Sequence, residues 1–181
     1  MPDMLLDLSQ MRDSRAHVDR RYEPSAFGSG DDEAFRVGAP VELAFDIDKD
    51  RTQFNLVGRV RTVLGLACSR CLEPFSVAVD APFDLLYLPH AENTGEGEVE
   101  VEDDDLTTAY YRDEQIDLGQ LLHEQFYLAL PMKPLCRESC RGLCSQCGTN
   151  LNVESCACVQ QWTDPRLEGL RSILDKGGRE V

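Results

Sequence analysis

The chain has eight cysteines, a residue type that can bind metal ions or take part in redox reactions. Residues 1–12 carry neither a basic leader nor an apolar signal stretch, which predicts a cytoplasmic protein. Structural disulfides do not persist in that reducing compartment, so metal binding or redox chemistry is the expectation. Six of the eight fall within 23 residues: Cys136, Cys140, Cys144, Cys147, Cys156 and Cys158.

The center of this cluster, Cys144-Ser-Gln-Cys147-Gly148, has the form of a zinc knuckle. A tight turn brings two such sulfurs to one side, and the glycine permits positive φ. Tetrahedral closure needs a second pair, which Cys136/Cys140 or Cys156/Cys158 could supply. The sequence therefore predicts one structural zinc bound by four of these six cysteines, with an iron–sulfur cluster or redox-active thiols as alternatives. No histidine lies nearby, as suits a closed site.

The remaining pair, Cys68-Ser-Arg-Cys71, lies in a short connection between two strand patterns. Three interpretations stay open: a second metal half-site, a redox pair, or a local packing feature. In the third case the motif, including Arg70, could also contact a partner. A thioredoxin-type pair begins a helix, whose dipole stabilises the thiolate, and here strands flank the motif.

Hydrophobic periodicity predicts the strands and helices that surround these cysteines. Alternation predicts a strand over 41–48 and a hairpin of two long strands, 54–66 and 75–87, with Pro82 at an edge or bulge. A shorter strand is expected over 106–112. Asp117 caps a helix that ends before Pro131, and Asp164 caps a second, short C-terminal helix. The predicted fold class is α+β: an antiparallel β-sheet with packed helices and a small C-terminal zinc-knuckle module.

Charge divides the chain into two predicted domains. Residues 1–130 form an acidic body with 11 basic and 27 acidic residues, whereas residues 131–181, the zinc-binding module and C-terminal helix, hold 7 and 6. The segment 92–105 alone has eight carboxylates and is expected to form a mobile loop. The longest stretch without charge has 12 residues, too short to span a membrane. No phosphate-binding loop or catalytic motif is present, so the protein is not expected to be an enzyme.

Two stretches together resemble the YceD family: ACSRCLEPF, and LPMKPLC followed by CRGLCSQCGTNLN and CAC. The resemblance implies that Cys68, Arg70 and Cys71 form the family's turn motif, and that the six later cysteines form its C-terminal set. It also implies a role in ribosome biogenesis that affects the level of large-subunit (23S) ribosomal RNA.

Phosphate repels an acidic body, so we expect its partner to be a basic ribosomal protein or a ribosome-assembly factor rather than RNA. RNA contact, if any, would go through residues 133–158, which include Lys133, Arg137 and Arg141. The alternatives are a thiol-disulfide oxidoreductase that uses Cys68 and Cys71, or a zinc-ribbon regulator of transcription.

Overall fold

A six-stranded sheet dominates the computed structural model, which describes residues 4–11, 13–28, 34–90 and 107–158. The strand order is β2-β4-β5-β6-β7, and the two-residue β3 pairs with β5 where β4 no longer reaches. All neighbours are antiparallel except β6 and β7. The bounds are β2 Arg15–Tyr22, β3 Arg36–Val37, β4 Val41–Asp50, β5 Gln53–Ala67, β6 Pro74–Pro89 and β7 Thr108–Tyr111. The predicted α+β class with an antiparallel sheet is confirmed, apart from the parallel β6–β7 pair.

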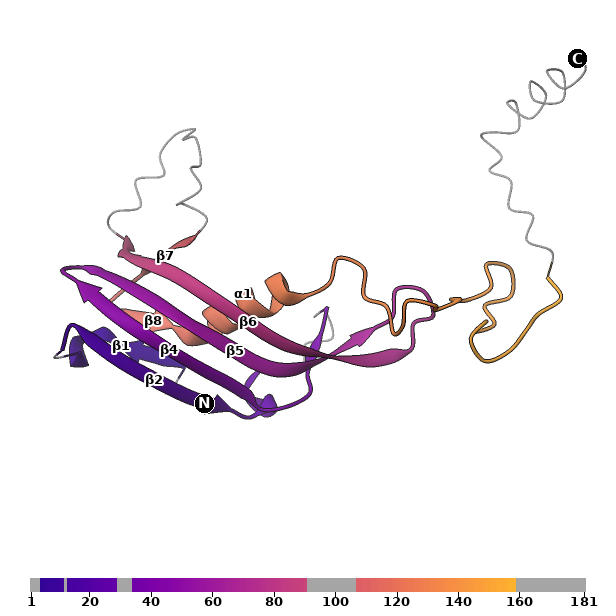
Figure 1. The fold of residues 1–181 in the computed structure, drawn as a ribbon, viewed down its shortest axis with the longest axis horizontal. Helices are drawn as coiled ribbons and strands as arrows, with labels where there is room; N and C mark the ends of the chain where they lie inside the picture. The colour runs from indigo at the N-terminus through magenta and orange to yellow at the C-terminus, as the bar shows by residue number, and fades with distance from the viewer. Residues whose placement is uncertain (1–3, 12, 29–33, 91–106, 159–181) are drawn as a thin grey trace, which may run out of the picture.

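The β5–β6 hairpin is the longest feature of the sheet and carries the Cys68–Cys71 motif at its tip. Its register runs without interruption from Phe54 opposite Tyr87 to Ala67 opposite Pro74. Because β4 covers only part of β5, the tip extends past the rest of the sheet toward the cysteine-rich segment (Figure 1). β7 pairs only with Leu86–Pro89, so β6 has no described neighbour on that side at Pro82. This agrees with the edge position expected for Pro82.

One face of the sheet is covered by α1, Leu118–Ala129, and by a small second sheet of β1, Leu5–Asp7, and β8, Gln115–Asp117 (Figure 1). The predicted cap is present, since Asp117 accepts hydrogen bonds from the backbone N–H groups of Gly119 and Gln120. The helix buries Leu121, Leu122 and Phe126 against the inward-facing residues of β4, β5 and β6. The short 3-10 turns η1, Leu8–Gln10, and η2, Pro24–Ala26, complete the described elements. The predicted loop 92–105 and C-terminal helix lie outside the described residues.

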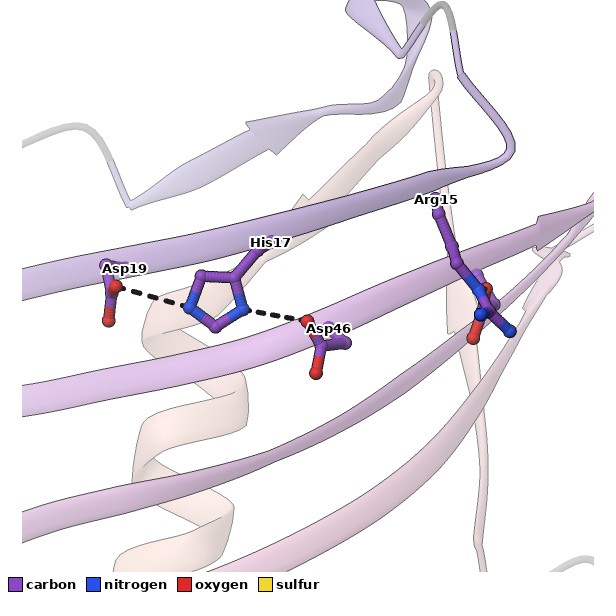
Figure 2. Close-up of polar contacts among 5 residues, drawn as sticks. Arg15, His17, Asp19 and Asp46 are labelled. Atoms are coloured by element: carbon purple, nitrogen blue, oxygen red, sulfur yellow. Dashed lines mark hydrogen bonds and ion pairs between the residues drawn. The ribbon is translucent and has the colours of Figure 1, made fainter.

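Hydrophobic periodicity does not predict the N-terminal strand β2, because Arg20 breaks its alternation at an inward position. Its outward side chains pair with those of β4 across the open face of the sheet. Arg15 pairs with Asp48 and Arg21 with Glu42, while the ring of His17 lies between two carboxylates. His17 Nδ1 lies 2.7 Å from Asp46 Oδ1, and His17 Nε2 lies 3.2 Å from Asp19 Oδ2. Figure 2 shows the ring between the two carboxylates.

The His17 contacts predict a pH dependence. The hydrogen bond to Asp46 raises the pKa of His17 above its ordinary value, and charge from Asp46 and Asp19 adds to it. A raised folded-state pKa contributes stability below about pH 6.5, and the contribution is lost as pH rises through the folded value. We expect Asp46→Asn to bring the pKa of His17 back toward 6.5 in an NMR titration, while Asp50→Asn, at the end of β4, leaves it unchanged. Equal values in all three proteins would contradict the pairing.

Candidate metal centers

The eight cysteines form two separate groups of four. We call Cys68, Cys71, Cys136 and Cys140 the inner site, and Cys144, Cys147, Cys156 and Cys158 the outer site. Within each group the four sulfurs lie within 4.8 Å of one another. All eight cysteines are free thiols. The structure thus offers two places that could hold a metal ion, whereas the sequence predicted one zinc and left the Cys68–Cys71 pair open as a second half-site.

The inner site has the dimensions of a tetrahedral thiolate center. Cys68 Sγ lies 3.8 Å from Cys140 Sγ, and Cys71 Sγ lies 3.8 Å from Cys136 Sγ. A tetrahedron with metal–sulfur bonds of about 2.3 Å has edges of about 3.8 Å, whereas a disulfide would need about 2.05 Å. The spacing of the sulfurs therefore fits a four-coordinate ion and excludes bonded pairs.

The hairpin tip positions two of the inner ligands through its own backbone. Cys68 N donates to Glu73 O at 2.9 Å and Leu72 N to Cys68 O at 2.9 Å, which closes the turn on itself. Leu72 takes a φ of 62°, at the position where the outer knuckle has Gly148 with a φ of 73°. A leucine in the left-handed region is uncommon, and this one is 66% exposed. The two CxxC turns thus share one backbone form although only one has glycine.

The other two inner ligands reach the tip because residues 134–143 bind along it. Ser69 N and Ser69 Oγ both donate to Pro134 O, at 2.9 and 2.8 Å. The guanidinium of Arg70 donates to Cys140 O at 2.8 Å, and Leu143 N donates to Arg70 O at 3.1 Å. Arg70 therefore holds the cysteine-rich segment against the hairpin, and its guanidinium is engaged by backbone carbonyls.

The outer site is built from local contacts within residues 142–158. Cys144 N donates to Thr149 O and Gly148 N to Cys144 O, which forms the predicted knuckle. Gly142 has a φ of 75°, and a Cβ there would lie 3.0 Å from Arg70 O, so the close approach to the hairpin requires glycine. Cys147 and Cys158 are exposed, whereas Cys68, Cys71 and Cys140 of the inner site are buried. The two sites therefore differ in access to solvent.

The thiol pKa values indicate that each group needs a cation to ionise fully. A hydrogen bond from the backbone N–H of Cys136, with those of Arg70 and Cys71, lowers the pKa of Cys68 to about 6. Burial and the neighbouring sulfurs raise the pKa of Cys136 to about 12. In the outer site, Thr149 lowers the pKa of Cys147 to about 6, and the Cys147 sulfur raises that of Cys158 to about 12. Four adjacent thiolates repel one another unless a divalent ion lies between them.

The structure groups the knuckle with the downstream pair, which is one of the two pairings considered from the sequence. Cys144 and Cys147 lie with Cys156 and Cys158, while Cys136 and Cys140 lie with Cys68 and Cys71. Cys68 and Cys71 thus supply two of the four sulfurs of the inner site, as a metal half-site would. The spacing of cysteines in the sequence does not indicate the inner group, because Cys71 and Cys136, whose Sγ atoms meet, are 65 residues apart in the chain.

The redox interpretation of Cys68 and Cys71 has little geometric support. Thiol-disulfide exchange requires an attacking sulfur that a substrate can reach. Cys68 is 0% and Cys71 4% exposed. The fold and these two sites define a class of protein: an α+β sheet protein whose longest hairpin is joined to a cysteine-rich segment through four sulfurs.

Comparison with known proteins shows the family to which this chain belongs. Residues 56–174 match the family model described as large ribosomal RNA subunit accumulation protein YceD. The matched range contains both cysteine groups. The chain belongs to the YceD family, as its two motifs suggested.

Its relatives include plant and bacterial proteins. A maize protein with the name large ribosomal RNA subunit accumulation protein YCED homolog 1, chloroplastic, is 33% identical over 156 residues, covering 74% of this chain and 53% of the relative. The Arabidopsis thaliana protein of that name is 27% identical over 148 residues, covering 70% and 46%. An uncharacterised Mycobacterium tuberculosis protein is 31% identical over 141 residues, covering 78% and 65%. The chain thus spans about half the length of the plant relatives.

No solved structure matches the chain significantly. Within the described residues, no helix has the length and apolar character needed to cross a membrane.

Proposed function

We propose that the chain acts in large-subunit ribosome biogenesis as a non-enzymatic adaptor that supports 23S ribosomal RNA accumulation by binding a basic ribosomal protein or assembly factor. The family and the names of the plant relatives support the ribosomal role. The observation that supports a basic protein partner is the excess of carboxylates in residues 1–130, 27 against 11 basic residues. Such a surface repels nucleic acid and attracts basic proteins.

The ion pairs of the sheet strengthen this argument. Arg15 and Arg21 on the open face each lie beside a carboxylate, and Arg59 and Arg61 share Asp80. Arginines already paired in this way contribute little to neutralising a phosphate backbone. In this proposal a zinc ion in each cysteine group has a structural role, because four thiolates suit zinc and leave no open position for chemistry. The inner ion would hold residues 133–158 on the hairpin.

We expect basic ribosomal proteins to copurify with the full chain, and the association rate to fall by about tenfold between low and physiological salt. A variant with Glu96, Glu98, Glu100 and Glu102 replaced by Gln should bind more slowly. A variant that removes four dispersed carboxylates, Asp13, Glu23, Asp50 and Glu154, by the equivalent amide substitutions controls for net charge. Copurification of RNA polymerase in place of ribosomal proteins would contradict the proposal, as would salt-independent binding.

A further inference from the structure

A cleft of about 620 Å³ lies between the beginning of α1, the turn that joins β7 to β8, and the end of β6. The strand β7 and the end of β6 that line it lie at the opposite end of the sheet from the hairpin tip (Figure 1), so the cleft is separate from both cysteine groups. Its lining is mainly polar and includes Tyr87, Tyr110, Arg112, Asp113, Asp117 and Glu124.

Three carboxylates give the cleft its charge. Asp117 uses Oδ1 to accept from Gly119 N and Gln120 N, and Glu124 uses Oε1 to accept from Gln120 Nε2 at 2.9 Å. The second oxygen of each carboxylate has no hydrogen bond within the described part of the chain. Among the described residues that line the cleft, the one cation is Arg112, and its Nη2 lies 2.6 Å from His90 Nε2. The net charge of the described residues that line the cleft is therefore negative.

The phenol of Tyr87 is the second, independent feature of this cleft. Tyr87 is only 6% exposed, and its hydroxyl makes no hydrogen bond to any of the residues that the structure describes. The hydroxyl oxygen itself is not among the buried atoms without a partner, so it still reaches solvent and its hydrogen-bonding capacity is open to a ligand in the cleft. Burial, followed by the charges of Glu124 and Asp117, raises the pKa of Tyr87. The hydroxyl therefore stays protonated and can both donate and accept.

The turn beside the cleft keeps a carboxylate at its rim despite an unfavourable backbone. Asp113 and Glu114 have φ values of 52° and 54°, and Gln115 N donates to Arg112 O at 2.8 Å across the turn. Both positions of such a two-residue turn favour glycine or asparagine. An acidic pair here gives up local stability and places the Asp113 carboxylate in the cleft lining.

We propose that this cleft binds a cationic side chain, lysine or arginine, of a basic protein segment. The proposal rests on the proposed function and names where that partner is held. An ammonium group offers three donors, which match the Glu124 carboxylate, the second oxygen of Asp117 and the Tyr87 hydroxyl as acceptors. Among the described residues only cysteines form groups close enough to hold a metal ion, so these carboxylates suit an organic cation. An anionic ligand would be repelled.

The test uses the zinc-loaded full chain and a fluorescently labelled, acetylated hexalysine amide, with labelled hexaglutamate as the control peptide. Binding is measured by fluorescence anisotropy at about 50 mM salt, where screening is weak. We expect Glu124→Gln and Tyr87→Phe each to raise the dissociation constant for hexalysine by about threefold. Glu23→Gln, which removes a charge outside the cleft, should change it by less than about 1.5-fold. Backbone amide shifts of Tyr110 and Gln120 should move on titration.

Each outcome is decisive. Threefold weakening confined to the cleft variants, with shifts at Tyr110 and Gln120, supports the proposal. If all three variants weaken binding equally, or if the shifts map elsewhere, the cleft is not the site, and copurification of basic ribosomal proteins can still uphold the adaptor function. If hexalysine binds in the cleft but no basic ribosomal protein copurifies, the proposed function fails while the cation site stands. Tyr87→Phe keeps the ring, so a matching thermal unfolding curve confirms that the variant is folded.

Discussion

Protein purified without oxygen is expected to contain two zinc ions per chain, and single cysteine variants should remove them separately. Cys147→Ser should leave one ion, held by the buried inner site. Cys136→Ser should remove the inner ion, because three buried thiols cannot close the tetrahedron that the four sulfurs define. Elemental analysis measures the metal content, and the absence of visible absorption distinguishes zinc from an iron–sulfur cluster.

The two variants should differ most in stability. An inner ion closes a chain loop of 65 residues between Cys71 and Cys136. Loss of a cross-link of that length costs about 4 kcal/mol in chain entropy. Hydrogen exchange should therefore rise along the hairpin tip and throughout residues 134–158 in Cys136→Ser, but only within residues 144–158 in Cys147→Ser.

Ser145→Ala provides the control, since this residue lies between two outer ligands and is not itself one. It should retain both ions. A single ion in the unmodified chain would overturn the prediction, as would loss of the same ion in both cysteine variants.

Gly58→Ala is expected to destabilise the sheet more than other glycine substitutions in β5. Gly58 lies at an inward position, opposite Phe45 of β4 and Phe83 of β6, whose ring centroids are 6.2 Å apart. A Cβ at residue 58 would come within 2.7 Å of Phe45 Cα, a distance that requires the two strands to separate. We expect the free energy of unfolding to fall by about 3 kcal/mol, as for overpacked cores.

Gly65→Ala, in the same strand, is the matched control. The nearest atom to a Cβ at Gly65 is Arg36 O at 3.7 Å, an ordinary contact. The expected change is within about 0.5 kcal/mol. Urea unfolding followed by circular dichroism, with zinc present throughout, measures both variants. Similar midpoints for the two proteins would show that β4 and β5 can move apart at Gly58 without cost.

Elements with local signals could be predicted from the amino-acid sequence. Alternation of apolar residues gave strands β4, β5 and β6, since side chains along a strand point to opposite faces and only one face is buried. Asp117 and Pro131 bounded α1 because capping depends on residues within one turn. The Cys144–Cys147 knuckle was recognisable for the same reason. β2 was missed because Arg20 interrupts the pattern, and its place beside β4 comes from pairing of their backbones.

The grouping of the cysteines could not be predicted, because it depends on contacts between distant segments. Spacing made Cys136 and Cys140 candidates to join the nearby knuckle, yet they meet Cys68 and Cys71 at the hairpin tip. The strands of that hairpin are long enough to carry the tip past the sheet, and Arg70 and Ser69 bind the returning chain there. Likewise, the alternating pattern of β6 indicates only that Tyr87 faces inward. Its position in a cleft with three carboxylates depends on the packing of α1 and the β7–β8 turn beside it. Contacts between distant segments depend on strand length, register and packing together, which no local pattern encodes.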